Sequence, residues 1–224
     1  MRLRPGKLEA MNIKASMLMF AFSMGVLCHA QSNGFVRIVQ NGGFESYTGT
    51  INGSSVFQSW VNEIGDPFSD QYSTHPIEFG PITRGLPWNL TYLFGGQVPL
   101  TAVTQRNIPI TFDGQLIDGG LVKLRLSAWL GGFRDQDDYA TCDVLLRDQS
   151  GGLIGQPLTI GPVTRIMRNG VTGMMQLSKT IRVPAGVRKV DVIVSLVRLQ
   201  GTANNGMADD VVVEVGTGLS GFGD

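Results

Sequence analysis

Apolar and polar side chains alternate along several stretches of the chain. In the clearest stretch, residues 122–130, every even position is apolar and most odd positions are polar. The same alternation recurs in residues 140–146, 171–183, 190–196 and 211–215. Because successive side chains of a strand point to opposite faces, each stretch predicts a strand with one buried and one solvated face. No stretch of ten or more residues shows the 3.6-residue period of an amphipathic helix.

Turn-forming residues separate these stretches. Glycine pairs, Asn-Gly steps and a Pro-Ala-Gly step occupy residues 118–120, 131–132, 150–152, 169–170, 184–186 and 204–206. Strands at this spacing predict an all-β fold in which two antiparallel sheets pack face to face, as in a β-sandwich or jelly roll. Residues 50–100 are less regular, and we expect long loops around short strands there. No repeat or linker divides residues 31–224, so we predict one domain with a core of about residues 35–215.

The first 30 residues have the pattern of a secretory signal peptide. Four basic residues lie within the first 14 positions, and the 13 residues from 15 to 27 carry no charge. Cys28 and Ala30 then occupy positions −3 and −1 of a cleavage site before Gln31. We therefore expect a secreted or extracellular protein, with the periplasm or the cell surface as alternatives. Two other interpretations remain, in which Met11 is the true start or Cys28 is a lipidated cysteine.

Composition excludes several classes of function. The chain has 18 Lys and Arg against 18 Asp and Glu, so no basic excess favours nucleic acid. No segment after the signal reaches the ~18 apolar residues of a membrane-spanning helix. One of the two cysteines and one of the two histidines lie before residue 31, which leaves Cys142 and His75. An internal disulfide and a zinc cluster are therefore not expected in the exported chain.

The opening, middle and end of the chain resemble one family. Residues 41–45 read Asn-Gly-Gly-Phe-Glu, and residues 204–211 read Asn-Asn-Gly-Met-Ala-Asp-Asp-Val. With residues 126–132, 136–138, 161–163 and 183–186 between them, these motifs resemble galactose-binding-like β-sandwich modules of secreted bacterial proteins. The resemblance covers roughly residues 35–215. Met207 and Asp210 depart from the pattern, which usually has an aromatic residue and Asn there.

This resemblance implies a metal site and a class of ligand. Many such modules bind carbohydrate without catalysing a reaction, and a structural Ca²⁺ joins the opening motif to the last strand. In this chain the matching carboxylates are Glu45 and Asp209. Two carboxylates brought close together repel each other unless a hard cation neutralises them. The alternative is that both are ordinary rim residues or hydrogen-bond acceptors at strand ends.

Two groups of residues are candidates for contact with a sugar. Trp129 alternates onto the polar face of its strand with Arg125, where an indole ring can stack on the C–H face of a sugar. Trp129 can equally lie beneath a loop. The second group is Gln136, Asp137 and Asp138, whose side chains suit paired hydrogen bonds to hydroxyls. Alternatively, this acidic loop is simply solvated, or it binds a second cation.

Catalysis has little support in the sequence. His75 precedes a proline and has no nucleophile motif nearby, and Cys142 falls on an apolar strand face. Our leading hypothesis is therefore a non-catalytic, lectin-like carbohydrate-binding module whose partner is a polysaccharide or glycan. An extracellular structural or adhesion protein that binds another protein is the alternative. A glycoside hydrolase with a carboxylate pair is a third, weaker hypothesis.

Overall fold

The computed structural model describes residues 35–49, 53–73 and 91–217. The predicted signal peptide and His75 lie outside these residues. The described residues all belong to one compact unit. Within the described part of the chain, no helix is long and apolar enough to cross a membrane.

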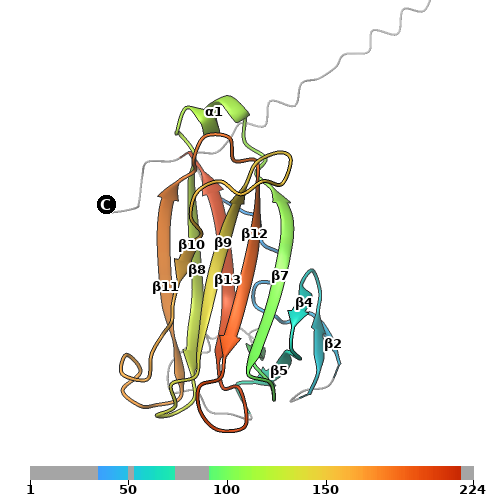
Figure 1. Cartoon of the computed structure of the whole chain (residues 1–224), viewed down its shortest axis with the longest axis vertical. Helices are drawn as coiled ribbons and strands as arrows, with labels where there is room; N and C mark the ends of the chain where they lie inside the picture. Colours follow the sequence, from blue (N-terminus) through green and yellow to red (C-terminus); the bar gives the residue numbers. More distant parts are fainter. Residues whose placement is uncertain (1–34, 50–52, 74–90, 218–224) are drawn as a thin grey trace, which may run out of the picture. The chain divides into compact units, whose positions relative to one another are not determined.

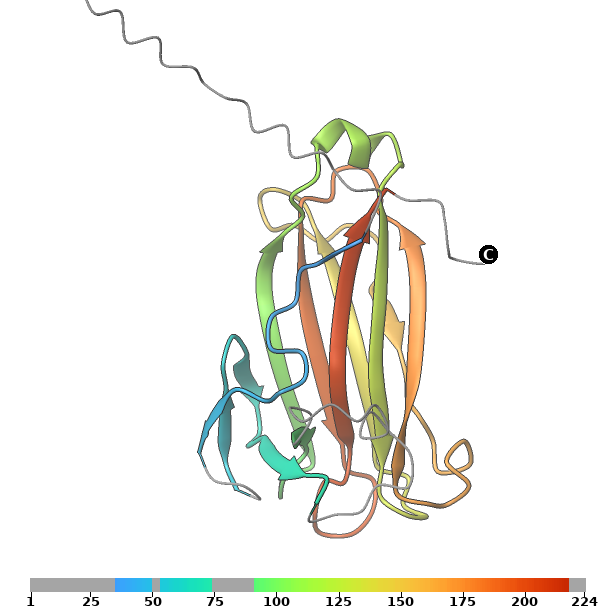
Figure 2. The ribbon, with the colours of Figure 1, turned by 180° about the vertical axis from the view of Figure 1, so that it is seen from behind.

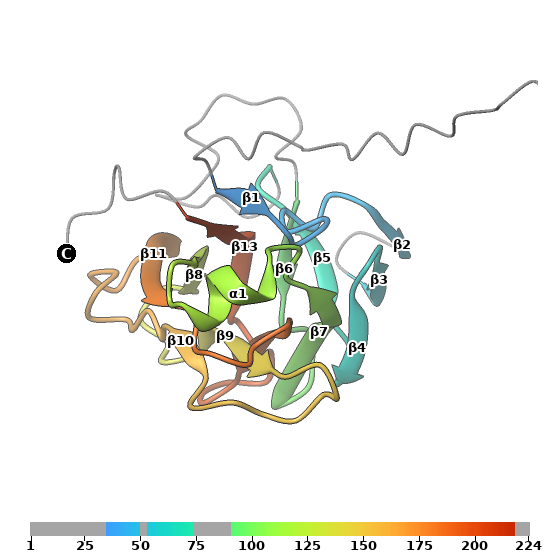
Figure 3. The same ribbon diagram turned by 90° about the horizontal axis from the view of Figure 1, so that it is seen from above.

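Two antiparallel sheets face each other, as the alternating pattern predicts (Figures 1 and 3). The first, which we call the β8 sheet, has the order β11-β8-β13-β6-β5, and β1 also pairs with β13. Its strands are β1 (Val36–Arg37), β5 (Phe68–Gln71), β6 (Thr91–Phe94), β8 (Lys123–Gly132), β11 (Gly173–Arg182) and β13 (Met207–Gly216). The β8 sheet is the layer that faces the reader in Figure 2.

The second sheet, the β9 sheet, has the order β10-β9-β12-β7-β4. Its strands are β4 (Val61–Ile64), β7 (Leu100–Pro109), β9 (Tyr139–Arg147), β10 (Leu158–Ile160) and β12 (Lys189–Val197). A small hairpin of β2 (Tyr47–Gly49) and β3 (Ser55–Phe57) completes the described strands. A single helical turn, α1 (Gly114–Asp118), begins where the Asp113 side chain accepts a hydrogen bond from the Gln115 amide.

Alternate side chains of the long strands form the core between the two sheets. All five even positions from Val122 to Leu130 are fully buried, as are Ala140, Cys142 and Val144 in β9. In β11 the predicted apolar positions Met175, Leu177 and Ile181 are only partly buried, because this strand lies at the edge of its sheet. The predicted all-β sandwich is therefore confirmed, including the side of β8 that faces the core.

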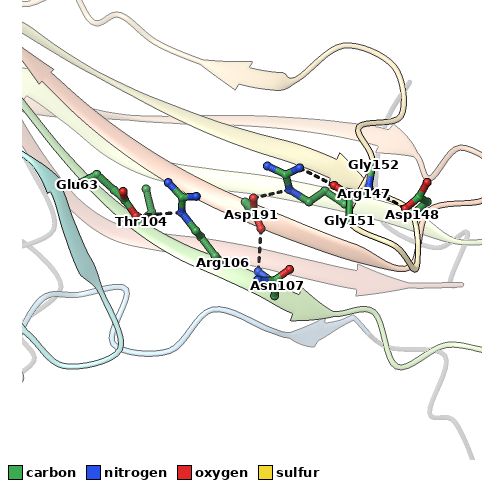
Figure 4. Close-up of polar contacts among 9 residues, drawn as sticks. All are labelled: Glu63, Thr104, Arg106, Asn107, Arg147, Asp148, Gly151, Gly152 and Asp191. Carbon is green, nitrogen blue, oxygen red and sulfur yellow. Dashed lines mark hydrogen bonds and ion pairs between the residues drawn. The ribbon is translucent and has the colours of Figure 1, made fainter.

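The outer face of the β9 sheet carries two separate ion pairs, one between Arg106 and Glu63 and one between Arg147 and the buried carboxylate of Asp191 (Figure 4). Asp191 accepts a 2.8 Å hydrogen bond from the Asn107 amide and a second from Arg147. Asn107 has a φ of 56°, and the pairing of β7 with β12 shifts register beside it. Asp191 thus supplies an acceptor for a backbone N–H group at an irregularity of the strand pairing.

Two neighbouring glycines of the opening motif differ in the space around them. A Cβ atom at Gly42 would lie 1.9 Å from the carbonyl oxygen of Val211 in the last strand. At Gly43 the nearest atoms would be 3.8 Å away. The Val211 amide donates a 2.9 Å hydrogen bond to the Gly42 carbonyl, so the two backbones approach directly.

We expect Gly42→Ala to destabilise the fold by about 2–4 kcal/mol, because the new methyl group would push the opening segment away from the last strand. Gly43→Ala is the matched control and should change stability by less than about 1 kcal/mol. Urea unfolding of both variants measures the difference. Equal stability of the two variants would contradict this account of the close approach.

Candidate ligand-binding site

Strand register brings side chains from β6, β8, β11 and β13 together on the outer face of the β8 sheet. Trp129 lies opposite Gln176 of β11 and Asp209 of β13. Beyond Asp209 the β13 register shifts, and Asp210 adopts a φ of 46° before pairing resumes at Val212. The outward direction predicted for Trp129 is therefore correct, and Asp209 is its direct neighbour on the same face.

Trp129 is part of a second apolar cluster on this outer face, separate from the core. The cluster centres on four buried side chains, Tyr72, Tyr92, Met174 and Met207. Trp129, Phe94 and Phe133 pack around them and are partly buried. The Trp129 ring is therefore partly covered by its neighbours.

Each buried tyrosine of this cluster donates a hydrogen bond to a carboxylate. The Tyr72 hydroxyl lies 2.6 Å from Asp209 Oδ2, and the Tyr92 hydroxyl lies 2.6 Å from Asp70 Oδ2. The two rings are 5.0 Å apart between centroids. Burial and the adjacent carboxylate both raise the pKa of each tyrosine, so both hydroxyls stay protonated and act as donors.

Glu45 and Asp209, the predicted calcium ligands, lie near each other beside Gly43. A Cβ atom at Gly43 would be 3.8 Å from Asp209 Oδ1, from Asp210 Oδ1 and from Glu45 Cγ. Asp209 is fully buried, and burial raises its pKa well above the usual range, as do the charges of Asp210 and Glu45. Glu45 also accepts hydrogen bonds from the backbone amide and hydroxyl of Thr91.

All potential donors here are oxygens, which are the ligands that Ca²⁺ takes. No group of three or more His, Cys, Asp or Glu side chains among the described residues has the arrangement of a metal site. A cation at this position would therefore depend on backbone carbonyls and water besides the two carboxylates.

A pocket of about 290 Å³ opens beside the aromatic cluster, and we call it the aromatic pocket. Its apolar walls come from Phe68, Tyr92, Phe94, Phe133, Ala203 and Met207. Three hydrogen-bonding side chains, Asp70, Gln97 and Asn205, complete the lining. The guanidinium group of Arg134 lies 4.8 Å from the centre of the Phe133 ring.

The predicted loop residues Gln136 and Asp138 lie behind one wall of this pocket. Asp138 is fully buried, and its carboxylate accepts hydrogen bonds from the backbone amides of Leu199, Gln200 and Asn205 at 2.6–2.9 Å. The Gln136 side chain accepts a hydrogen bond from the Asn205 amide group. Both residues therefore hold Asn205, and Asp138 is not exposed to a ligand.

Asp137, the third predicted loop residue, points to a different partner. Its carboxylate forms a 3.0 Å ion pair with Arg165, and the two side chains are 39% and 49% exposed. Such exposed pairs contribute little to stability. Asp137 is not among the residues that line the aromatic pocket.

Arg125 lies in a second, polar hollow of about 320 Å³ farther along the same face. It is paired with Glu214, which also contacts Arg37, and it lies 5.7 Å from the centre of the Phe35 ring. The other lining residues are Ser127, Gln176, Ser178, Asp210 and Val212. Trp129 and Arg125 therefore share a sheet face but not a pocket.

Sequence reasoning did not find the residues that line the aromatic pocket. Phe94 lies on a short strand in the irregular region, and Phe133 follows a glycine pair, so neither has an alternation pattern that shows its direction. Asn205 belongs to the closing motif, and that motif was the signal that could have indicated it. Cys142 is fully buried, and burial raises the pKa of its thiol, as expected for an unreactive core cysteine.

Comparison with known proteins gives similarity in structure alone. No family model matches the chain, and no curated protein is similar to it in sequence. The Stig cyclase Fisc from Fischerella sp. TAU is 12% identical with a TM-score of 0.50, over 83% of this chain and 100% of that one. The xylan-binding domain CBM22-1 of Paenibacillus barcinonensis Xyn10C is 12% identical with a TM-score of 0.40, over 85% and 99%.

The similarity is one of fold, and it agrees with the predicted all-β sandwich. Several similar structures are parts of much longer chains. This chain spans 21% of a bacteriophage CBA120 tailspike protein (14% identity, TM-score 0.47, 80% of this chain). It also spans 29% of a Clostridium thermocellum xylanase chain that contains CBM22-1 and GH10 modules. At these identities the similarity establishes the β-sandwich fold and leaves function to the site itself.

The raised pKa of Asp209 predicts an unusual dependence of stability on pH. An unfolded Asp loses its proton near about pH 3.9, whereas the folded carboxyl keeps it to higher pH. Between these two pKa values the folded state binds more protons, so the stabilisation from this group falls as pH rises. In chelator, the unfolding free energy of the wild type relative to Asp209→Asn should therefore decrease from about pH 4 upward.

Asp118→Asn is a control of opposite sign, because hydrogen bonds from Arg188 and Gly186 lower the pKa of Asp118. The contribution of Asp118 is present above about pH 4 and is lost as pH falls through its folded pKa. Urea unfolding at a series of pH values measures both slopes. The account of a raised pKa at the buried Asp209 would be contradicted if the difference in unfolding free energy between the wild type and Asp209→Asn stayed constant or grew above pH 4.

Proposed function

We propose that this protein is a non-catalytic, extracellular module that binds carbohydrate in the aromatic pocket. The observation that carries the proposal is the combination of aromatic walls with a few converging polar groups in one pocket of suitable size. Carbohydrate-binding modules are among the structures with this fold, but a fold hosts many functions. The chemistry of the pocket is therefore the basis of the proposal.

The aromatic walls fit the apolar faces of a sugar ring. A pyranose presents C–H groups on its faces, and contact of these groups with Phe94 and Phe133 removes apolar surface of both partners from water. Phe94 and Phe133 are partly buried, so part of each ring is accessible. Trp129, which we expected as the stacking ring, supports this cluster from within it.

The polar residues fit the edge of the same ring. Asn205 uses its amide N–H groups on Gln136 and on the Ala203 carbonyl, so its orientation is fixed. Its Oδ1 atom accepts no hydrogen bond from the residues that the structure describes and is available to a hydroxyl. Gln97 is exposed at the rim and can both donate and accept. This arrangement gives directed hydrogen bonds beside an apolar surface, which is what distinguishes sugars from purely apolar ligands.

Calcium between Glu45 and Asp209 is the second part of the proposal. A cation there would offset the mutual repulsion of Glu45, Asp209 and Asp210, which all lie around Gly43. It would also join the opening segment to the last strand, in a chain whose described cysteine is unpaired. The role is structural, because these carboxylates do not line the aromatic pocket.

We expect the protein to bind at least one defined glycan in a broad panel, and Phe133→Leu to weaken that binding about tenfold. Leucine keeps the apolar volume but loses the flat ring, and aromatic contacts contribute about 0.5–1.5 kcal/mol beyond area burial. Leu199→Ala is the matched control, because Leu199 is 60% exposed in a neighbouring loop outside the pocket. Isothermal titration with unchanged melting temperature is the measurement.

Three results would each reject one part of this proposal: the site, the carbohydrate ligand or the non-catalytic role. Loss of binding with Arg125→Ala but not with Phe133→Leu would place the sugar in the polar hollow. No binding across the panel by a folded protein would favour the structural or adhesion role. Turnover of a glycan that depends on a carboxylate pair would make the protein a hydrolase.

Calcium should raise the melting temperature by about 5–10 °C over chelator when it is present at about one hundred times its dissociation constant. Glu45→Gln should abolish this shift, whereas Glu63→Gln, on the opposite sheet, should keep it. Because Ca²⁺ binds the ionised form of Asp209, the shift should shrink as the solution is acidified. Identical melting curves with calcium and with chelator would reject the calcium proposal and leave the glycan proposal standing.

A further inference from the structure

Arg168 is a fully buried arginine next to the aromatic pocket. Its Nη1 atom donates to the carbonyls of Gly132, Arg134 and Val171 at 2.8, 2.9 and 2.5 Å. Its Nη2 atom donates to the Gln136 carbonyl at 2.9 Å. The side chain is therefore surrounded by backbone carbonyl groups, three of which belong to the loop 132–136 between β8 and β9.

This burial is costly and therefore needs a structural reason. A buried charge loses its hydration, and Arg168 shows this as a pKa lowered by desolvation. No carboxylate of the described residues lies within hydrogen-bond or ion-pair distance of its guanidinium, and its Nε atom has no partner there. Asp137 and Asp138 act on it only through their charges. Hydrogen bonds from a charged donor are stronger than neutral ones, and three of the four that Arg168 donates go to one loop.

Arg168 binds the carbonyl of every second residue in that loop. Two of these carbonyls flank Phe133, and the third belongs to Gln136. Gly132 and Arg134 stand on either side of Phe133, whose ring lines the pocket. Gln136 comes next, and its side chain holds the Asn205 amide group. One side chain thus fixes the backbone that carries the aromatic wall and the residue that orients the polar wall.

We propose that Arg168 is a positioning residue that pre-organises the aromatic pocket, acting on Phe133 through the flanking carbonyls and on Asn205 through Gln136. This inference rests on the proposed function for its binding consequence, although the loop geometry stands independently of it. A loop without ladder hydrogen bonds would otherwise sample several conformations, and ordering it on ligand binding would cost affinity. Arg168 makes that order permanent in the free protein.

Asp138 complements this role from the other side of Asn205. Its carboxylate holds the backbone amides of residues 199, 200 and 205, whereas Arg168 holds carbonyls of residues 132–136. The Gln136 and Asn205 side chains form one further link between the two loops, beside the hydrogen bond from the Asp137 amide to Gln200 Oε1. Removal of the Gln136 side chain should therefore release the Asn205 side chain while leaving Arg168 and its carbonyl partners in place.

The test compares Arg168→Lys, Arg168→Met and Gln136→Ala with Arg165→Met in the full chain. Lysine can satisfy some of the four carbonyls, whereas methionine satisfies none. Arg165 lies in the same turn, exposed and paired with Asp137, and serves as the control. Hydrogen exchange is followed in residues 132–138 and 199–206 and in the strands β9 and β12, together with glycan affinity and melting temperature.

We expect exchange in both loops to speed up about tenfold or more in Arg168→Met, less in Arg168→Lys, and not in Arg165→Met, with β9 and β12 unchanged. Glycan affinity should fall in the same order. Gln136→Ala should speed exchange in residues 199–206 alone and weaken binding several-fold. If Arg168→Met does not fold, Arg168→Lys and Gln136→Ala decide the question.

Two patterns would overturn the proposal. In the first, Arg168→Lys and Gln136→Ala both keep wild-type exchange in the loops and wild-type affinity. In the second, exchange rises equally in the loops and in β9 and β12, which would make Arg168 a general stabilising residue. A wild-type protein that binds no glycan would reject the proposed function, whereas the exchange pattern would still decide the role of Arg168.

Discussion

The exclusion of alternate side chains from water between the two sheets is the constraint on which the rest of this structure depends. Once Leu124, Leu126 and Ala128 face the core, the two-residue period of the strand directs Arg125, Ser127 and Trp129 outward. Pairing with β13 then places Asp209 beside Trp129. A slip of one residue would exchange the two faces, so the core and the outer polar and aromatic surface are specified together.

The same constraint explains which features could be predicted from sequence. Strand alternation identified the sandwich, the core positions of β8 and β9, and the outward direction of Trp129, because periodicity encodes the side of a strand. The proximity of Glu45 and Asp209 followed from a resemblance, since 164 residues separate them and no local pattern joins them. The buried role of Asp138 could not be predicted, because its partners are backbone amides some sixty residues away.

Loops differ from strands in how their backbone polar groups are satisfied. A strand finds its partners in the sheet, whereas several backbone groups of the loops 132–138 and 199–206 are paired with side chains. Arg168 supplies donors for carbonyls of the first loop, and Asp138 supplies acceptors for amides of the second. Two buried charges thus fix segments that the sheets do not hold. A polar triplet such as residues 136–138 therefore resembles a solvated loop in sequence even when one member, Asp138, is fully buried.

The two hollows of the β8 sheet differ in what a ligand could gain there. In the polar hollow Arg125 and Arg37 are already paired with Glu214, so a ligand would have to share or replace those interactions. In the aromatic pocket the rings of Phe94 and Phe133 are partly exposed beside the guanidinium of Arg134, and Asn205 keeps an acceptor. Covering the exposed part of a ring releases water without breaking an ion pair. In the aromatic pocket, which sequence patterns did not reveal, a ligand would thus replace fewer existing protein contacts than in the polar hollow.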